Sequence, residues 1–206
     1  MLGKMARLAF AHTGITWRSL FHFRWVAALM LACMLLSPTT RAATDAIDIT
    51  QAHLEATSEG YVLSASFSFE LNHTLEDALM HGIPLHFTTD IELTRPRWYW
   101  FDEKAVKASQ TIRLSYNALT HQYNVAVIGS VQQSFDTLED ALLLIRRPSR
   151  WLVAENGVLQ AGAAYNVTVR MGLNLEYSSK PFQVNALNNS DWRLYSDRKT
   201  FIFRVE

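Results

Sequence analysis

The sequence is poor in cysteine, glycine and proline, and it carries no excess of charge of either sign. Its 206 residues include one cysteine, eight glycines and five prolines, and 19 basic side chains balance 19 acidic ones. One thiol cannot build a disulfide framework or a cysteine-ligated zinc module, and the balanced charge argues against a broadly basic nucleic-acid binder. So little glycine and proline argues against a fibrous or disordered chain. Because 49% of the residues are apolar, we expect a folded protein with a hydrophobic core.

The charges are unevenly distributed, since the first carboxylate of the chain is Asp45. Residues 1–24 contain Lys and Arg but no acidic residue, residues 25–36 form the apolar run WVAALMLACMLL, and small residues follow at Ala42 and Ala43. This order predicts a secretory signal peptide over residues 1–43, followed by one exported domain over residues 44–206. The apolar run is shorter than the roughly 20 residues of a transmembrane helix, so an uncleaved inner-membrane anchor is the alternative.

The predicted leader changes the character of the chain that follows it. Residues 43–206 keep 14 basic and 19 acidic side chains, a net charge of −5, and the single thiol, Cys33, lies within the leader. An acidic domain without cysteine suits an oxidising compartment. We therefore expect a periplasmic or otherwise exported protein that touches a membrane only through the leader, if the leader is not cleaved.

Alternation of apolar and polar residues dominates the chain after the leader. The alternating segments are residues 61–71, 85–94, 111–116 and 165–177, and shorter strand candidates are residues 47–56, 98–101, 122–128 and 200–205. A period of two is typical of antiparallel strands with one buried face. Seven or eight such strands predict a mainly β domain, a two-sheet antiparallel sandwich or an incomplete barrel.

Two short α-helices are predicted to interrupt the strands. The hexapeptide TLEDAL occurs twice, beginning at Thr74 and at Thr137, and each copy has an Asp three residues after its Thr. A hydroxyl followed by an acidic side chain at this spacing is typical of a helix start, and Gly82 and Pro148 follow as stop signals. The residues around the two copies do not repeat, which favours a shared helix-start pattern over an internal duplication.

The densest candidate site is the segment RPRWYWFDEK at residues 95–104. As a strand it places Trp98 and Trp100 on one face and Tyr99 and Phe101 on the other. Arg95 and Arg97 flank this aromatic run. Arginine stacks on indole rings and holds carboxylates in a bidentate manner. The patch can therefore bind a sugar, a peptide or an aromatic anchor of a partner protein, or it can seal the two predicted sheets together.

A second candidate is the polar segment at residues 180–192. Its Asn and Gln side chains can hydrogen-bond irregular backbone, which makes it either a plain long connection or a ligand-binding loop. The binding hypothesis combines residues of both segments. They are Arg95, Arg97, Trp98, Trp100, Asn185, Asn188 and Trp192.

No catalytic residue, metal site or cofactor is predicted. The chain has no G-x-S-x-G, no H-E-x-x-H and no glycine-rich phosphate loop. His86 and Asp90 fall on the polar face of a predicted strand, where solvent is the expected environment for both. Asp102 and Glu103 are adjacent carboxylates, and neighbours on a strand point to opposite faces, so they are not expected to act as an acid–base pair.

Several segments, in this order along the chain, resemble a known family. They are EGYVLSA at 59–65, ELTRPRWYWFDEK at 92–104, RLSYNALT at 113–120, QSFDTLEDAL at 133–142, and KPFQVNAL with DW at 180–192. Together they are similar to a proteobacterial family of exported domains of unknown function, number 4390. The resemblance implies a Gram-negative source and an envelope location. Because similar proteins are often encoded beside a membrane sensor histidine kinase, it also implies an envelope protein, such as that kinase, as a partner.

The expected function is that of a periplasmic binding or protein-interaction module that is accessory to envelope sensing and is not an enzyme. Two alternatives from other classes remain open at this point. One is a glycan- or peptidoglycan-binding domain that uses the arginines and tryptophans of residues 95–100. The other is an enzyme of an unrecognised type.

Overall fold

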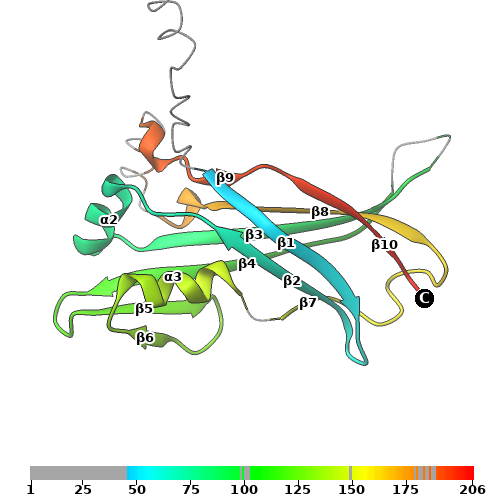
Figure 1. The fold of residues 1–206 in the computed structure, drawn as a ribbon, viewed down its shortest axis with the longest axis horizontal. Coiled ribbons are helices and arrows are strands. Elements are labelled where there is room, and N and C mark those ends of the chain that lie inside the picture. The colour runs from blue at the N-terminus through cyan, green and yellow to red at the C-terminus, as the bar shows by residue number, and fades with distance from the viewer. Residues whose placement is uncertain are drawn as a thin grey trace, which may run out of the picture. The chain divides into compact units, whose positions relative to one another are not determined.

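The computed structural model describes residues 46–97, 99, 103–148, 150–178, 180, 183, 186 and 189–206. Strands dominate these residues (Figure 1), which confirms the mainly β class. The strands in them are β1 (Ala46–Ala56), β2 (Gly60–Ser68), β3 (Leu85–Arg95), β4 (Glu103–Asn117), β5 (Gln122–Val127), β6 (Gln133–Phe135), β7 (Trp151–Glu155), β8 (Ala164–Leu173), β9 (Tyr195–Ser196) and β10 (Lys199–Arg204). Helices α2 (His73–Met80) and α3 (Leu138–Arg146) lie where the two helices are expected, and η1 (Leu175–Tyr177) and η2 (Ser190–Trp192) are short 3-10 turns. The described residues Lys180, Gln183 and Ala186 are also helical.

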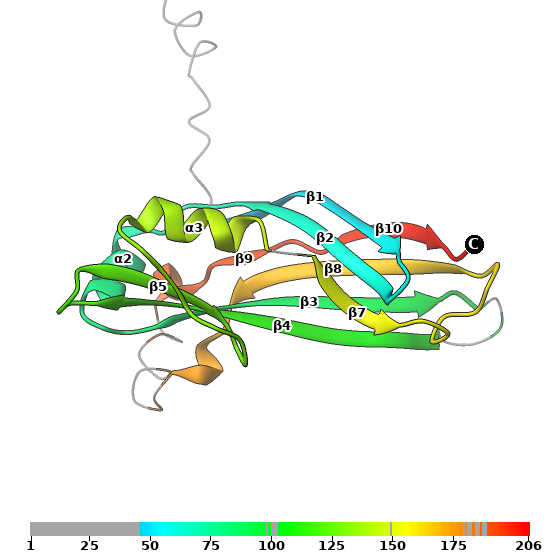
Figure 2. The same cartoon turned by 90° about the horizontal axis from the view of Figure 1, so that it is seen from below.

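The described strands pair in the order β6-β5-β4-β3-β8-β9-β1-β2-β7, and β10 pairs with β8. Among them only β1 and β9 pair in parallel, over residues 46–47 and 195–196. Figure 2 shows β1 and β2 lying over β8 and β3, so the sheet curls into a half-barrel. The two predicted layers are thus joined into one sheet by β9, which pairs with β8 on one side and with β1 on the other. With only two residues, β9 is too short to leave an alternating pattern in the sequence.

The strand predicted at residues 98–101 lies mostly outside the described residues. Tyr99, which is described, is in a bend between β3 and β4 and is exposed. Strands β4 and β5 form an antiparallel hairpin, because β4 ends at Asn117 and β5 begins at Gln122. Asn117 Oδ1 accepts hydrogen bonds from the backbone N–H groups of Leu119 and Thr120, which closes this turn.

The core fills the inside of the curled sheet. The inward residues of β8 alternate as predicted, and both helices add one apolar face each. The buried side chains of these elements are Tyr165, Val167, Val169 and Met171 of β8, Leu75, Ala78 and Leu79 of α2, and Ala141, Leu142 and Ile145 of α3. Each fully buried Leu, Ile or Phe contributes about 1.5–3 kcal/mol relative to exposure, so packing rather than helix propensity stabilises these short helices.

The two copies of the hexapeptide start their helices differently. Thr137 caps α3, since its Oγ1 accepts from the Asp140 N–H at 3.1 Å. The cap of α2 is Asn72 instead, whose Oδ1 accepts from the Leu75 N–H at 3.0 Å. The prediction of Thr74 as a cap is wrong because Asn72 is at least as good a cap and the Thr74 hydroxyl donates to Asp191 at 3.0 Å.

Within the described residues, no helix combines the length and the hydrophobicity needed to cross a membrane.

Candidate functional site

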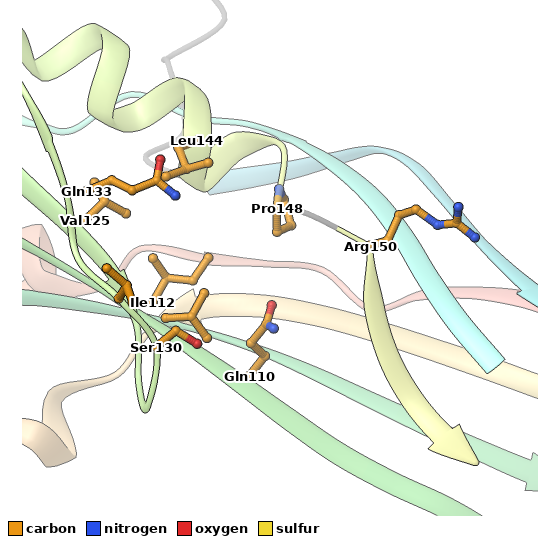
Figure 3. A pocket seen from close by; sticks show the side chains of 10 residues that line it. Gln110, Ile112, Val125, Ser130, Gln133, Leu144, Pro148 and Arg150 are labelled. Atoms are coloured by element: carbon orange, nitrogen blue, oxygen red, sulfur yellow. The ribbon is translucent and has the colours of Figure 1, made fainter. Parts of the chain in front are cut away.

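A cavity of about 290 Å³ lies between the β4–β5 ladder and the connection from α3 to β7 (Figure 3). We call it the aliphatic pocket, because most of its described lining consists of aliphatic side chains and proline. These are Ile112, Val125, Val127, Val131, Leu144 and Pro148. Neutral polar groups come from Gln110, Ser130 and Gln133, and Arg150 completes the described lining.

The pocket exists because β5 is much shorter than β4. The two strands pair only over residues 112–117 of β4, and the chain then turns away at Gly129, whose φ of 89° suits a glycine. The edge of β4 around Gln110 is therefore not paired with β5. Helix α3 lies above this gap and places Leu144 in its wall.

The rim of the pocket exposes aliphatic side chains on the β5–β6 connection. Val131 lines the pocket although 88% of it is exposed, and Ile128, three residues earlier, is half-exposed. Covering apolar surface yields about 25 cal/mol per Å². An aliphatic group that enters the pocket can therefore gain free energy from the walls and from this rim together.

Arg150 is the charged residue among the described lining residues. Its side chain is 65% exposed, and its Nη2 lies 3.7 Å from Glu55 Oε2, which is longer than a hydrogen bond. Figure 3 shows its guanidinium turned away from the cavity. Arg150 is therefore an arginine at the pocket that makes a long ion pair with Glu55 but no hydrogen bond to it.

The sequence-predicted arginines lie elsewhere, where β3 ends and β4 begins. Arg95 and Arg97 both donate a hydrogen bond to the carboxylate of Glu103, and Arg95 also donates to Gln160. The hydrogen bonds from Arg97 and then Arg95 lower the pKa of the Glu103 carboxyl. These arginines hold a carboxylate, as their chemistry suggests, but it belongs to the same chain. A role for them in ligand binding stays a prediction.

The residues of the two predicted segments that the structure describes do not lie together. Trp192 is buried in η2, which packs on α2, and Asn72 of the α2 cap donates to the Asp191 carbonyl at 2.7 Å. Helix α2, against which Trp192 packs, comes just before the first residue of β3, and Arg95 is the last residue of β3. Trp192 and Arg95 therefore lie at opposite ends of β3 (Figure 1). The other four residues of the binding hypothesis lie outside the described residues. They are Trp98, Trp100, Asn185 and Asn188.

His86 is buried, with 6% of its surface exposed, so the expectation of a solvated side chain is wrong. Its ring stacks on Tyr177 with centroids 4.9 Å apart, and its Nδ1 has no hydrogen-bond partner. The sequence pattern extends the last long strand to Tyr177, but β8 ends at Leu173 and the chain turns over β3. Asp90 is exposed as expected.

We expect the stability of the fold to decrease as the pH falls below 6.5. Burial, and then the charge of Arg113, lower the pKa of His86 from 6.5. In this range the unfolded chain therefore binds a proton that the folded protein does not, and protonation favours unfolding. Urea denaturation at pH 7.5 and 5.5 measures the loss. His86→Phe should reduce this pH dependence, whereas His73→Phe, at an exposed histidine, should keep it. Equal slopes in both variants would contradict the assignment to His86.

Sequence reasoning missed the aliphatic pocket altogether. Its walls come from β4, β5, β6, α3 and the connection to β7, and each wall residue looks like an ordinary strand or helix position. No signal in the sequence marks the gap, because the predicted strands at 111–116 and 122–128 have nearly the same length and only the structure shows that β4 begins at Glu103. Among the described residues, no group of three or more His, Cys, Asp or Glu side chains is placed to hold a metal ion.

A family model described as a domain of unknown function (DUF4390) matches residues 44–202. The match covers nearly all of the predicted exported domain and confirms the resemblance seen in the sequence. Comparison with curated proteins and with solved structures finds no match. Because the family description names no activity, an inference about function starts from the aliphatic pocket.

Proposed function

This chain belongs to the DUF4390 family, and we propose that it is an exported binding module that holds an aliphatic group in the aliphatic pocket. The observation that carries the proposal is the pocket itself, an open cavity with aliphatic walls and an exposed aliphatic rim. The basic and then apolar order of residues 1–36 supports export to the envelope. There a binding module can serve as an accessory to sensing, because an occupied and an empty pocket present different surfaces to a partner protein.

The walls of the pocket favour binding because they belong to regular elements. Ile112 and Val125 lie on paired strands and are almost fully buried, and Leu144 lies on α3. A ligand that enters such a site does not have to order its walls, which removes one of the main costs of binding. The volume of about 290 Å³ is at the small end of the range for ligand sites, about 300–1,000 Å³. A single aliphatic chain or side chain fits that size better than a large ring system.

Filling the pocket tests the proposal. Leu144→Trp places a large ring in the cavity and should weaken binding of 1-decanol about tenfold or more, a loss of about 1.4 kcal/mol. Binding is measured by NMR, as shifts of the methyl signals of Ile112, Val125 and Val127. Leu143→Trp is the matched control, since Leu143 is the exposed neighbour on α3 and does not line the pocket. Equal binding by the two folded variants, or no binding by the unaltered protein, would disprove the proposal.

A further inference from the structure

We infer that the natural occupant of the aliphatic pocket is an aliphatic chain of about ten carbons that ends in a carboxylate, and that Arg150 binds this carboxylate. The inference rests on the proposed function, because it assigns the chemical class of the ligand to the same pocket. It is carried by the volume of the cavity, the chemistry of its walls and the state of the Arg150 side chain.

The volume of the pocket sets the length of the aliphatic ligand. An apolar cavity of about 150 Å³ in another protein holds benzene, which has six carbons. The aliphatic pocket is about twice as large, at about 290 Å³, and so holds roughly ten to twelve heavy atoms. The walls are aliphatic rather than aromatic, which suits a saturated chain better than a flat ring.

The charge at the pocket selects the end group. The described lining residues include no carboxylate, their neutral polar groups are two carboxamides and one hydroxyl, and Arg150 supplies one positive charge. This is the reverse of the predicted exported domain as a whole, since residues 43–206 have a net charge of −5. A guanidinium binds a carboxylate through two parallel charge-assisted hydrogen bonds, donates at most a weaker hydrogen bond to an alcohol oxygen, and repels an alkylammonium ion.

The Arg150 side chain is held by one long ion pair, with Glu55. Its Nη2 is 3.7 Å from Glu55 Oε2, a distance at which no hydrogen bond has to be broken before the side chain turns. Glu55 keeps another contact if Arg150 leaves, because its Oε1 lies 3.1 Å from His53 Nε2. The guanidinium points outward (Figure 3), so the proposed contact requires the side chain to turn toward the mouth of the pocket.

The inference is tested with four ligands that share a ten-carbon chain and differ only in the head group. Decanoate, 1-decanol, decylamine and decyl phosphate are titrated at pH 7.5 into the purified protein, and affinities are measured by calorimetry and methyl NMR. We expect decanoate to bind about tenfold more tightly than 1-decanol, since one charge-assisted hydrogen-bonded pair is worth roughly that factor. Decylamine should bind more weakly than 1-decanol. Arg150→Gln should bring decanoate to the affinity of 1-decanol and leave 1-decanol unchanged.

Arg147→Gln is the matched control, because Arg147 is a nearby exposed arginine that does not line the pocket. It should keep the preference for decanoate. If decanoate and 1-decanol bind equally, or if the preference survives Arg150→Gln, the inference is wrong while the proposed function stands. If decyl phosphate binds more tightly than decanoate, the carboxylate assignment is wrong. If none of the four ligands binds, the proposed function fails and the inference with it.

Discussion

Gly60→Ala should destabilise the fold by roughly 3 kcal/mol or more, because it combines backbone strain with overpacking. Gly60 begins β2 with φ 145°, a conformation that residues with a side chain rarely adopt. A Cβ atom there would lie 2.2 Å from the Ala154 carbonyl oxygen and 2.9 Å from Glu155 Cα. Both atoms belong to the backbone of β7, which pairs with β2 at this point. They cannot move away without breaking that pairing.

Gly157→Ala separates the two causes. Gly157 also has a positive φ, 84°, but no atom lies within 4 Å of the position of an added Cβ. Only the strain of the left-handed conformation remains, about 1–2 kcal/mol. The free energies of unfolding of both variants and the unaltered protein are measured by urea denaturation. If the two variants lose the same stability, the close approach of β7 is not what requires glycine at position 60.

The fold could be predicted wherever a strand has one face in the core. In β8 the buried residues Tyr165, Val167 and Val169 alternate with more exposed ones, and this pattern is visible in the sequence because water and core select opposite side chains. The end of the same strand was not predictable from alternation. Asn174 Oδ1 accepts from the Glu176 N–H at 2.9 Å, which starts η1 although Leu175 and Tyr177 continue the apolar period. A local side-chain hydrogen bond thus overrides the pattern.

The sequence predicted what Arg95 and Arg97 bind, a carboxylate, but not where that carboxylate comes from. The guanidinium groups of Arg95 and Arg97 do hold a carboxylate, but the antiparallel pairing of β3 with β4 sets Arg95 opposite Glu103 and satisfies them within the chain. The aliphatic pocket, in contrast, depends on where β5 stops pairing and on how α3 crosses the sheet. Both are properties of the three-dimensional arrangement, and no single segment of the sequence carries them.

Phe87→Ala should cost about 3–5 kcal/mol, as expected for loss of a buried aromatic ring with a cavity left behind. Phe87 is fully buried on β3, between Ile112 of β4 and Leu173 of β8. Its ring lies 5.3 Å from that of Phe69, which follows β2. The side chain therefore joins both layers of the curled sheet, and neither layer can close the cavity without separating from its partner strands.

The loss should extend to α3, and through it to the aliphatic pocket. Arg146 at the end of α3 donates from Nε to the Phe69 carbonyl at 2.9 Å, and its guanidinium lies 5.5 Å from the Phe69 ring. A displaced Phe69 loosens this anchor, and Leu144 of the pocket wall lies on the same helix. We therefore expect Phe87→Ala to weaken 1-decanol binding as well as stability, whereas Phe87→Leu should restore part of both.

Ile202→Ala is the control for Phe87→Ala, since 74% of Ile202 is exposed on β10. Removing an exposed apolar side chain usually changes stability by no more than about 0.5 kcal/mol. Urea denaturation gives the stability of each variant, and methyl NMR gives its 1-decanol affinity. A Phe87→Ala variant that is strongly destabilised but binds 1-decanol normally would show that the contact between Phe69 and Arg146 does not position α3. The pocket would then depend on the β4–β5 ladder alone.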